Sequence, residues 1–206
     1  MDNDILIIDK PEGIPVHPNT YVNPAKTLVN KLAKITGREI YSVHRLDSVT
    51  SGVMVFACNS TAAAGLSRCF KERVIGKRYI ALVRGYIEGT GTINIPLRPD
   101  KGRDPQEAET RFTSLCTTEI PEPIGRYAAA RYSLVEAELV TGRPQQIRRH
   151  FQDVNHPVIG DKAHGDRDHN RFFRERFGSE GIFLRAYRLS FPHPNDPGST
   201  VTAIAG

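Results

Sequence analysis

The 206-residue sequence lacks any long hydrophobic run. No segment approaches the roughly 20 apolar residues that a membrane-spanning helix needs. The chain begins Met1-Asp2-Asn3-Asp4, which is acidic where a secretory signal would be basic. We therefore expect neither export nor a membrane anchor.

Cysteine is also scarce. Cys58, Cys69 and Cys116 are odd in number and include no CxxC spacing, and two of them lie in apolar or helical stretches. This usage is typical of unpaired thiols in a reducing compartment rather than of disulfides or a zinc site. We predict three buried thiols and a cytoplasmic protein.

Positive charge is in modest excess, with a net charge of +5, but it is unevenly distributed. One third of the chain holds a cluster of basic residues: Arg143, Arg148, Arg149, Lys162, Arg167, Arg171, Arg174 and Arg176. Such a run can be a solvated helix face or a groove that follows nucleic-acid phosphates. The clustering favours the groove.

The chain contains short strand patterns and a few helical patterns, which is a mixed α+β content. The uninterrupted apolar run at 53–57 predicts a strand buried on both faces. Helices are expected over 27–35 with Gly37 as the stop, from Ser60 to about Val74 with Gly76 as the stop, from a Thr141 cap to Phe151, and up to Phe177. The other predicted strands are 5–8, 77–85, 92–95, 108–116, 127–140, 184–191 and 200–204.

The stretch 43–59 places charged residues directly before the buried strand. Arg45 and Asp47 would lie at the rim of a core, where an unpaired carboxylate is costly. Asp47 therefore needs a cationic partner or an open cleft. The alternative is an ordinary turn, in which Asp47 caps backbone N–H groups and Arg45 is solvated.

Two later stretches hold further candidates. Tyr79 lies in the predicted strand 77–85, where a core aromatic would be the usual interpretation. Arg148 lies inside the predicted helix after Thr141. His156 and Asp161 fit no metal-ligand spacing, so we interpret them as structural turn residues.

The motifs together resemble the RluA-type RNA pseudouridine synthase family. The matching segments are KPxGxxVH from Lys10, HRLD with TSG from His44, KRYxAxV from Lys77, TGRxxQIR from Thr141, and HPxxGD from His156. The segment His164-Gly165-Asp166-Arg167, followed by Asn170-Arg171, is similar to the tRNA pseudouridine synthase C branch. These matches extend from Lys10 to Pro194, nearly the whole chain.

The resemblance implies roles for particular residues. Asp47 corresponds to the catalytic aspartate, Arg148 to the arginine that pairs with it, and Tyr79 to a tyrosine that stacks on the target base. Arg45 would fill the space that a flipped-out base leaves in the RNA. We predict RNA contacts from the basic and aromatic side chains around the motifs: His44, Arg45, Lys77, Arg78, Arg143, Arg149, Arg167 and Arg171.

The chain departs from the family pattern at three positions. Gln145 and Arg185 stand where the family has histidine, and Asn155 stands where it has glycine. These changes leave Asp47 and Arg148 in place. Gln145, Arg185 and the long loop from Pro96 to Glu107 could redirect the choice to another tRNA position or to ribosomal RNA.

The implied fold is the pseudouridine synthase fold, a bent, mainly antiparallel mixed sheet with flanking helices and a central active-site cleft. We predict that residues 1–206 form a single catalytic domain without a separate N-terminal RNA-binding domain. The implied reaction needs no metal, cofactor or redox change. We expect a monomer that acts on tRNA in the acceptor/T-stem region or, alternatively, on ribosomal RNA.

Three other functions fit the sequence less well. A glycosidase or nucleoside hydrolase usually needs two carboxylates, and Asp47 has no acidic companion within its motif. A non-catalytic RNA-binding module would tolerate loss of Asp47, Tyr79 or Arg148, yet all three are present. A purely structural domain explains neither the basic cluster nor the acidic loop.

Overall fold

The computed structural model describes residues 2–18, 22–99, 102–125 and 127–206. The chain divides into two compact units, Met1–Lys77 with Ala186–Gly206 and Arg78–Arg185. The described residues form nine strands and four α-helices. Within this part of the chain, no helix is both long and apolar enough to span a membrane.

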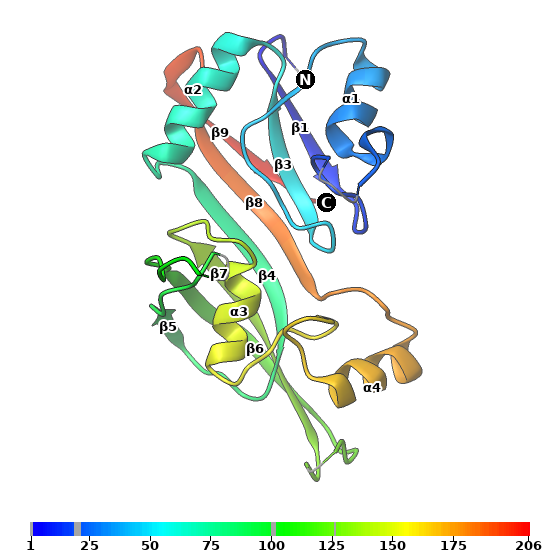
Figure 1. The fold of residues 1–206 in the computed structure, drawn as a ribbon. Helices are drawn as coiled ribbons and strands as arrows, with labels where there is room; N and C mark the ends of the chain where they lie inside the picture. The colour runs from blue at the N-terminus through cyan, green and yellow to red at the C-terminus, as the bar shows by residue number, and fades with distance from the viewer. Residues whose placement is uncertain (1, 19–21, 100–101, 126) are drawn as a thin grey trace. The chain divides into compact units, whose positions relative to one another are not determined.

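The first unit is built from antiparallel strands and two helices (Figure 1). Strand β1 (Ile5–Lys10) pairs with β3 (Ser51–Ala57), which also pairs with the short β2 (Tyr41–Ser42). Strand β8 (Leu184–His193) pairs with β9 (Asp196–Ile204). The helices are α1 (Leu28–Thr36) and α2 (Ser60–Lys71), and a 3-10 turn at Pro24–Lys26 precedes α1.

Strand β3 supplies the centre of the first unit's core. Its residues from Val53 to Ala57 are at most 3% exposed, so the predicted burial on both faces is confirmed. Val53 and Val55 pack with Leu66 of α2 and with Phe191 of β8. The loop that carries Asp47 therefore leads directly into a rigid strand.

The second unit is an antiparallel sheet with two helices. Its strands are β4 (Gly76–Arg84), β5 (Thr90–Ile93), β6 (Thr110–Ile120) and β7 (Ala130–Leu139), hydrogen-bonded in the order β4-β7-β6-β5. The helices are α3 (Gln146–Asp153) and α4 (Arg167–Phe177). Tyr132 of β7, Ile159 and Phe173 of α4 share one hydrophobic cluster, which anchors α4 to the sheet.

The predicted helix ends were partly wrong. Gly37 ends α1 in the left-handed conformation as expected, with φ 66°. The N-cap of α2 is Asn59, whose side chain accepts from Ala62 N, and α2 ends at Lys71 instead of near Val74. Arg73 has φ 58°, which is incompatible with continuing the helix, and Gly76 begins β4.

The prediction of three buried thiols was also wrong. Cys58 and Cys69 are half-buried and Cys116 is exposed, and all three are unpaired. Cys116 lies on β6 at a register shift relative to β7, between Ser114 and Cys116. An irregularity of this kind re-aims side chains, and no sequence period reveals it.

Candidate active-site residues

A buried lysine holds the loop that carries Asp47. Lys10, the last residue of β1, has no exposed surface. Its Nζ donates to the carbonyl oxygens of Pro11 at 2.9 Å, Ile14 at 3.0 Å and Ser48 at 3.0 Å. An ammonium has three donors, so these bonds use all three, and they tie the start of the chain to the residue after Asp47.

Asp47 itself is half-buried within this loop. Its carbonyl oxygen accepts from Thr50 N at 3.0 Å, and Ser48 O also accepts from Gly13 N at 2.8 Å. Burial lowers the pKa of Lys10 to about 8, while the nearby carboxylates of Glu12 and Asp47 oppose that shift. Asp47 therefore has a cationic neighbour within its own unit.

Gly52 lets β3 approach β8 closely at the end of this loop. Its φ is +118°, and a Cβ there would lie 2.1 Å from the carbonyl oxygen of Ala186. No side chain fits in that space. This explains physically why a glycine follows Thr50-Ser51 at the start of β3.

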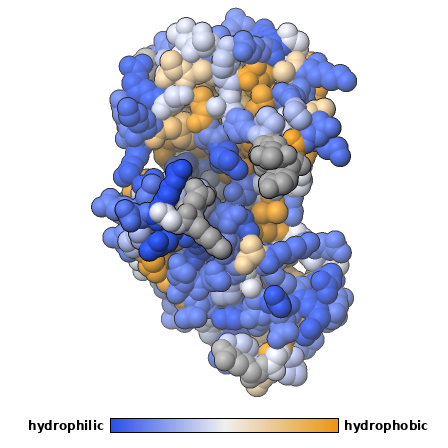
Figure 2. Space-filling view, in the orientation of Figure 1, coloured by the Kyte–Doolittle hydropathy of each residue, from blue (hydrophilic) through white to orange (hydrophobic). Residues whose placement is uncertain are grey.

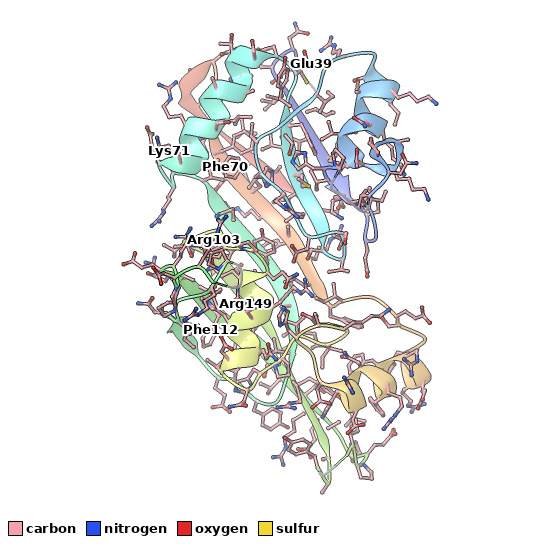
Figure 3. The ribbon with its side chains drawn as sticks, in the orientation of Figure 1. Glu39, Phe70, Lys71, Arg103, Phe112 and Arg149 are labelled. Carbon is pink, nitrogen blue, oxygen red and sulfur yellow. The ribbon has the colours of Figure 1, made fainter. Side chains whose placement is uncertain are left out.

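His44 is engaged by the protein's own backbone. Its Nε2 accepts from Val55 N at 3.1 Å, and its ring stacks on Phe70, with centroids 4.7 Å apart. Phe70 is labelled on α2 in Figure 3. Burial, with a smaller contribution from Lys77, lowers the pKa of His44 to about 3, so the ring is neutral at physiological pH. These contacts fit a structural role, and an RNA contact by His44 stays a prediction.

The other predicted RNA contacts in the first unit differ in burial. Arg45 is exposed, whereas Lys77 is half-buried. Burial, and then the charge of Arg73, lower the pKa of Lys77 to about 8. Both side chains carry positive charge near neutral pH.

In the second unit, β4 carries Tyr79 and Arg78. Tyr79 is 8% exposed and lies opposite Ala137 of β7. Arg78 Nη1 forms an ion pair with Glu136 Oε1 at 2.9 Å. Tyr79 is thus a largely buried aromatic on β4, and its neighbour Arg78 forms an ion pair with Glu136 of β7.

Helix α3 is fixed to β6 by a buried polar network. Gln146 Nε2 donates to Thr110 Oγ1 at 3.0 Å and to Glu109 O at 2.9 Å. His150 lies 3.0 Å from Ile95 O, a carbonyl that can only accept, so His150 Nε2 is the donor. His150 Nδ1 then accepts from Thr110 Oγ1 at 2.9 Å.

This network changes the start of α3 from the predicted one. Gln146, not a capping Thr141, begins the helix, and Gln145 precedes it with φ 55°. Thr141 Oγ1 donates to Gln146 Oε1 at 2.7 Å and accepts from Glu109 N at 2.9 Å. Thr141 therefore secures the loop before α3, and the predicted cap was wrong.

Arg148 lies on the buried side of α3 and pairs with Asp161. Its Nε and Nη2 donate to the carboxylate oxygens of Asp161 at 2.7 and 2.8 Å. Asp161 was predicted to be a turn residue, so its pairing with Arg148 was missed. The HPxxGD motif marks the position of Asp161 but says nothing about its partner.

The substituted family positions also have clear local roles. Asn155 has φ 62°, a conformation that asparagine adopts more readily than most residues, which explains how it replaces glycine. Gln145 Oε1 lies 2.7 Å from His164 Nε2. Arg185, the third departure, is half-buried in β8.

The basic residues of α4, of α3 and of the loop before α3 are partly paired. Arg143 Nε and Arg149 Nη1 donate to the carbonyls of Glu107 and Arg98, both at 2.9 Å. On α4, Arg167 is exposed and Arg171 pairs with Asp168 at 2.8 Å. The visible face of the molecule is mostly hydrophilic, with small hydrophobic patches (Figure 2). Figure 3 shows Arg149 on α3.

Comparison with known proteins gives consistent matches. A sequence model of the family described as RNA pseudouridylate synthase matches residues 4–153. The tRNA pseudouridine synthase C of Haemophilus ducreyi is 38% identical over 94% of this chain and 84% of its own length. That of Pectobacterium carotovorum is 39% identical over 94% of this chain, which spans about half, 54%, of the relative's length.

Solved structures agree with the fold. Human RNA Pseudouridylate Synthase Domain Containing 1 matches with a TM-score of 0.78 and 26% identity, over 100% of this chain and 81% of its own. Human RNA Pseudouridylate Synthase Domain Containing 4 matches with a TM-score of 0.74 and 23% identity, over 100% and 86%. The predicted α+β fold with a mainly antiparallel sheet is confirmed.

Proposed function

Because this chain belongs to the RNA pseudouridylate synthase family, we propose that it converts one uridine of a tRNA to pseudouridine. The observation that carries the proposal is the match over residues 4–153 together with relatives named tRNA pseudouridine synthase C. The segment His164-Gly165-Asp166, just before α4, and Asn170-Arg171 within α4 support a tRNA substrate in the acceptor/T-stem region.

The reaction is an isomerisation of the nucleotide. The bond from C1′ to N1 breaks, a bond from C1′ to C5 forms, C5 loses its proton and N1 gains one. Neither electrons nor atoms are exchanged with a cofactor. The enzyme needs a carboxylate near the sugar, a way to expose the base, and donors that hold the detached ring.

We assign the carboxylate to Asp47. The loop around it is fixed by Lys10 and leads into the buried strand β3, so the carboxylate is carried by a rigid element. Arg148 is proposed to keep Asp47 ionised, because a nearby guanidinium favours the charged form of a carboxylate.

Base recognition is assigned to the remaining motif residues. A stacked uridine cannot reach a carboxylate and must flip out of the RNA, at a cost of a few kcal/mol. Arg45, exposed beside Asp47, is proposed to occupy the vacated space. Tyr79 is proposed to stack on the uracil ring.

The RNA backbone is proposed to contact the basic side chains of both units. The exposed or half-buried members are Arg45, Lys77, Arg78, Arg143, Arg149, Arg167 and Arg171. Since charge-based contacts weaken with salt, RNA affinity should fall steeply between low and physiological ionic strength. We further propose a monomer that acts in the cytoplasm as a single catalytic domain.

The function is tested by mapping pseudouridine on total RNA from cells that lack this protein. Carbodiimide treatment followed by primer extension gives a stop at each pseudouridine. The deletion is complemented with wild type or with Asp47→Asn. One stop in tRNA that is lost on deletion and restored only by wild type supports the proposal.

Other outcomes of this mapping would support one of the alternative functions. A stop lost in ribosomal RNA would move the substrate from tRNA to rRNA. If every stop survives deletion, or if Asp47→Asn restores the stop fully, the protein is not this enzyme. A non-catalytic RNA-binding module would then be the better account.

A further inference from the structure

The guanidinium of Arg148 is held by a two-bond fork within its own unit. Arg148 Nε lies 2.7 Å from Asp161 Oδ2, and Nη2 lies 2.8 Å from Oδ1. The two side chains are 7% and 1% exposed. A planar guanidinium fixed at Nε and Nη2 cannot rotate, so the direction of its Nη1 edge is fixed as well.

The two carboxylate oxygens of Asp161 accept hydrogen bonds from different sets of donors. Oδ1 also accepts from Ala163 N at 2.9 Å and from His164 N at 3.0 Å, which shapes the turn after Asp161. Oδ2 accepts from Arg148 Nε. One oxygen thus serves the turn and half of the fork, and the other completes the fork.

The backbone of Asp161 is clamped by α4. Asn170 Nδ2 donates to Asp161 O at 2.8 Å, and Asn170 Oδ1 accepts from Gly160 N at 2.7 Å. Gly165 N donates to the same carbonyl at 3.0 Å, and a Cβ at Gly165 would lie 2.2 Å from it. Asp161 therefore has little freedom to move away from Arg148.

Asp161 is ionised under ordinary conditions. Burial alone would raise its pKa, but Arg148 and the backbone N–H groups of His164 and Ala163 hold the pKa below its usual value. A charged carboxylate on the Nε/Nη2 edge makes the fork strong. It also compensates the positive charge of Arg148, which α3 buries.

We propose that Asp161, clamped by Asn170, is a positioning residue that aligns Arg148 for the catalytic carboxylate. It holds the Nε/Nη2 edge and so directs the Nη1 edge. The inference rests on the proposed function, in which Arg148 keeps Asp47 ionised. It gives α4 a role in catalysis that is separate from its basic surface.

Asp161→Asn separates positioning from folding of the turn. The amide keeps one oxygen for Ala163 N and His164 N, but it sets an NH2 group against Arg148 Nε–H, so the fork is broken. The assay uses tRNA labelled with [5-³H]uridine from cells lacking the protein, with enzyme in excess. Tritium is released when C5 loses its hydrogen, and this gives a single-turnover rate constant.

We expect the rate constant of Asp161→Asn to fall by about 100-fold, as for other small misplacements of a catalytic group. The Kd for the tRNA should be unchanged. The acid limb of the pH–rate profile should move to higher pH, because a catalytic carboxylate with a poorly aligned guanidinium takes up a proton more readily. Loss of the Asp161 charge alone would move that limb to lower pH.

Controls make the result specific. Asp153→Asn, an exposed aspartate on α3, should leave the rate constant unchanged. If Asp161→Asn does not fold, Asn170→Ser releases the clamp more gently and should shift the acid limb in the same direction. A wild-type rate, or a lower rate with an unmoved acid limb, would overturn the inference and leave Asp161 structural.

Failure of the proposed function would look different. Wild type and Asp47→Asn would then release equal amounts of tritium, before any Asp161 variant is compared. That result would overturn both proposals. A failure confined to Asp161→Asn would overturn the positioning role alone.

Discussion

Lys10 Nζ donates to Ser48 O across 38 positions of sequence, at 3.0 Å, directly beside the proposed catalytic residue. Lys10 is the last residue of β1 and lies opposite Gly52 of β3. Its burial is unusual, because lysine is almost never fully buried unless its charge is satisfied. This contact fixes the loop around Asp47 relative to β1.

Replacing Lys10 should weaken the fold. Lys10→Met keeps the aliphatic stem but removes three hydrogen bonds, so we expect the free energy of unfolding to fall by about 2–3 kcal/mol. Urea denaturation of wild type and variant measures the change. Lys34→Met, an exposed lysine of α1, is the matched control and should have almost no effect.

The same lysine predicts a pH dependence of stability. The folded-state pKa of Lys10 is about 8 and its ordinary value is 10.5. Between pH 8 and 10 the unfolded chain therefore binds more protons than the folded chain. The free energy of unfolding of wild type, relative to that of Lys10→Met, should rise by about 2 kcal/mol over that interval. Denaturation at both pH values tests this, and a constant difference would contradict it.

His44 predicts a loss of stability at acid pH. Its folded-state pKa is about 3 against an ordinary value of 6.5, so acidification protonates the unfolded state first. Between pH 7 and pH 4, the free energy of unfolding of wild type should fall by about 3 kcal/mol more than that of His44→Phe. Phenylalanine keeps a ring to stack on Phe70 without a titrating nitrogen. NMR should show no titration of the native His44 ring above pH 5.

Gly52 should tolerate no side chain. In Gly52→Ala the new Cβ would lie 2.1 Å from Ala186 O, and the backbone φ there is +118°. We therefore expect the free energy of unfolding to fall by more than about 3 kcal/mol, or the variant to fail to fold. Gly89→Ala is the control, since Gly89 also has positive φ, +66°, but nothing within 4 Å. The free energy of unfolding of Gly89→Ala should fall by only about 1 kcal/mol. Thermal unfolding compares the two, and equal losses would exclude the steric explanation.

The exposed thiol gives a chemical test of the fold. Cys116 should react fastest with a thiol reagent, because Cys58 and Cys69 are half-buried. A Cys116→Ser variant should lose the fast phase and keep the slow ones. A fast phase that persists in this variant would contradict the exposure of Cys116 on β6.

The sequence was most informative where local pattern and motif coincide. The apolar run of β3, the stop at Gly37 and the positions of Asp47, Tyr79 and Arg148 follow from contiguous residues. The family and the fold were predicted correctly from these motifs. The catalytic roles themselves stay proposals.

The sequence was least informative where contacts join distant residues. The burial of Lys10 depends on Ser48, and the orientation of Arg148 depends on Asp161 and, through it, on Asn170. No local repeat in the sequence reveals either of these contacts. The cap expected from Thr141 failed because Gln146 takes its hydroxyl into a network that joins α3 to β6.

In the proposed reaction, Asp47 is the carboxylate that is required to convert uridine to pseudouridine. The most direct measurement is single-turnover tritium release from [5-³H]uridine-labelled tRNA by purified wild type, Asp47→Asn and Glu39→Gln, an exposed carboxylate in the same unit. We predict release by wild type and Glu39→Gln and none by Asp47→Asn, although all three bind the tRNA equally. Release by Asp47→Asn at the wild-type rate would contradict the account.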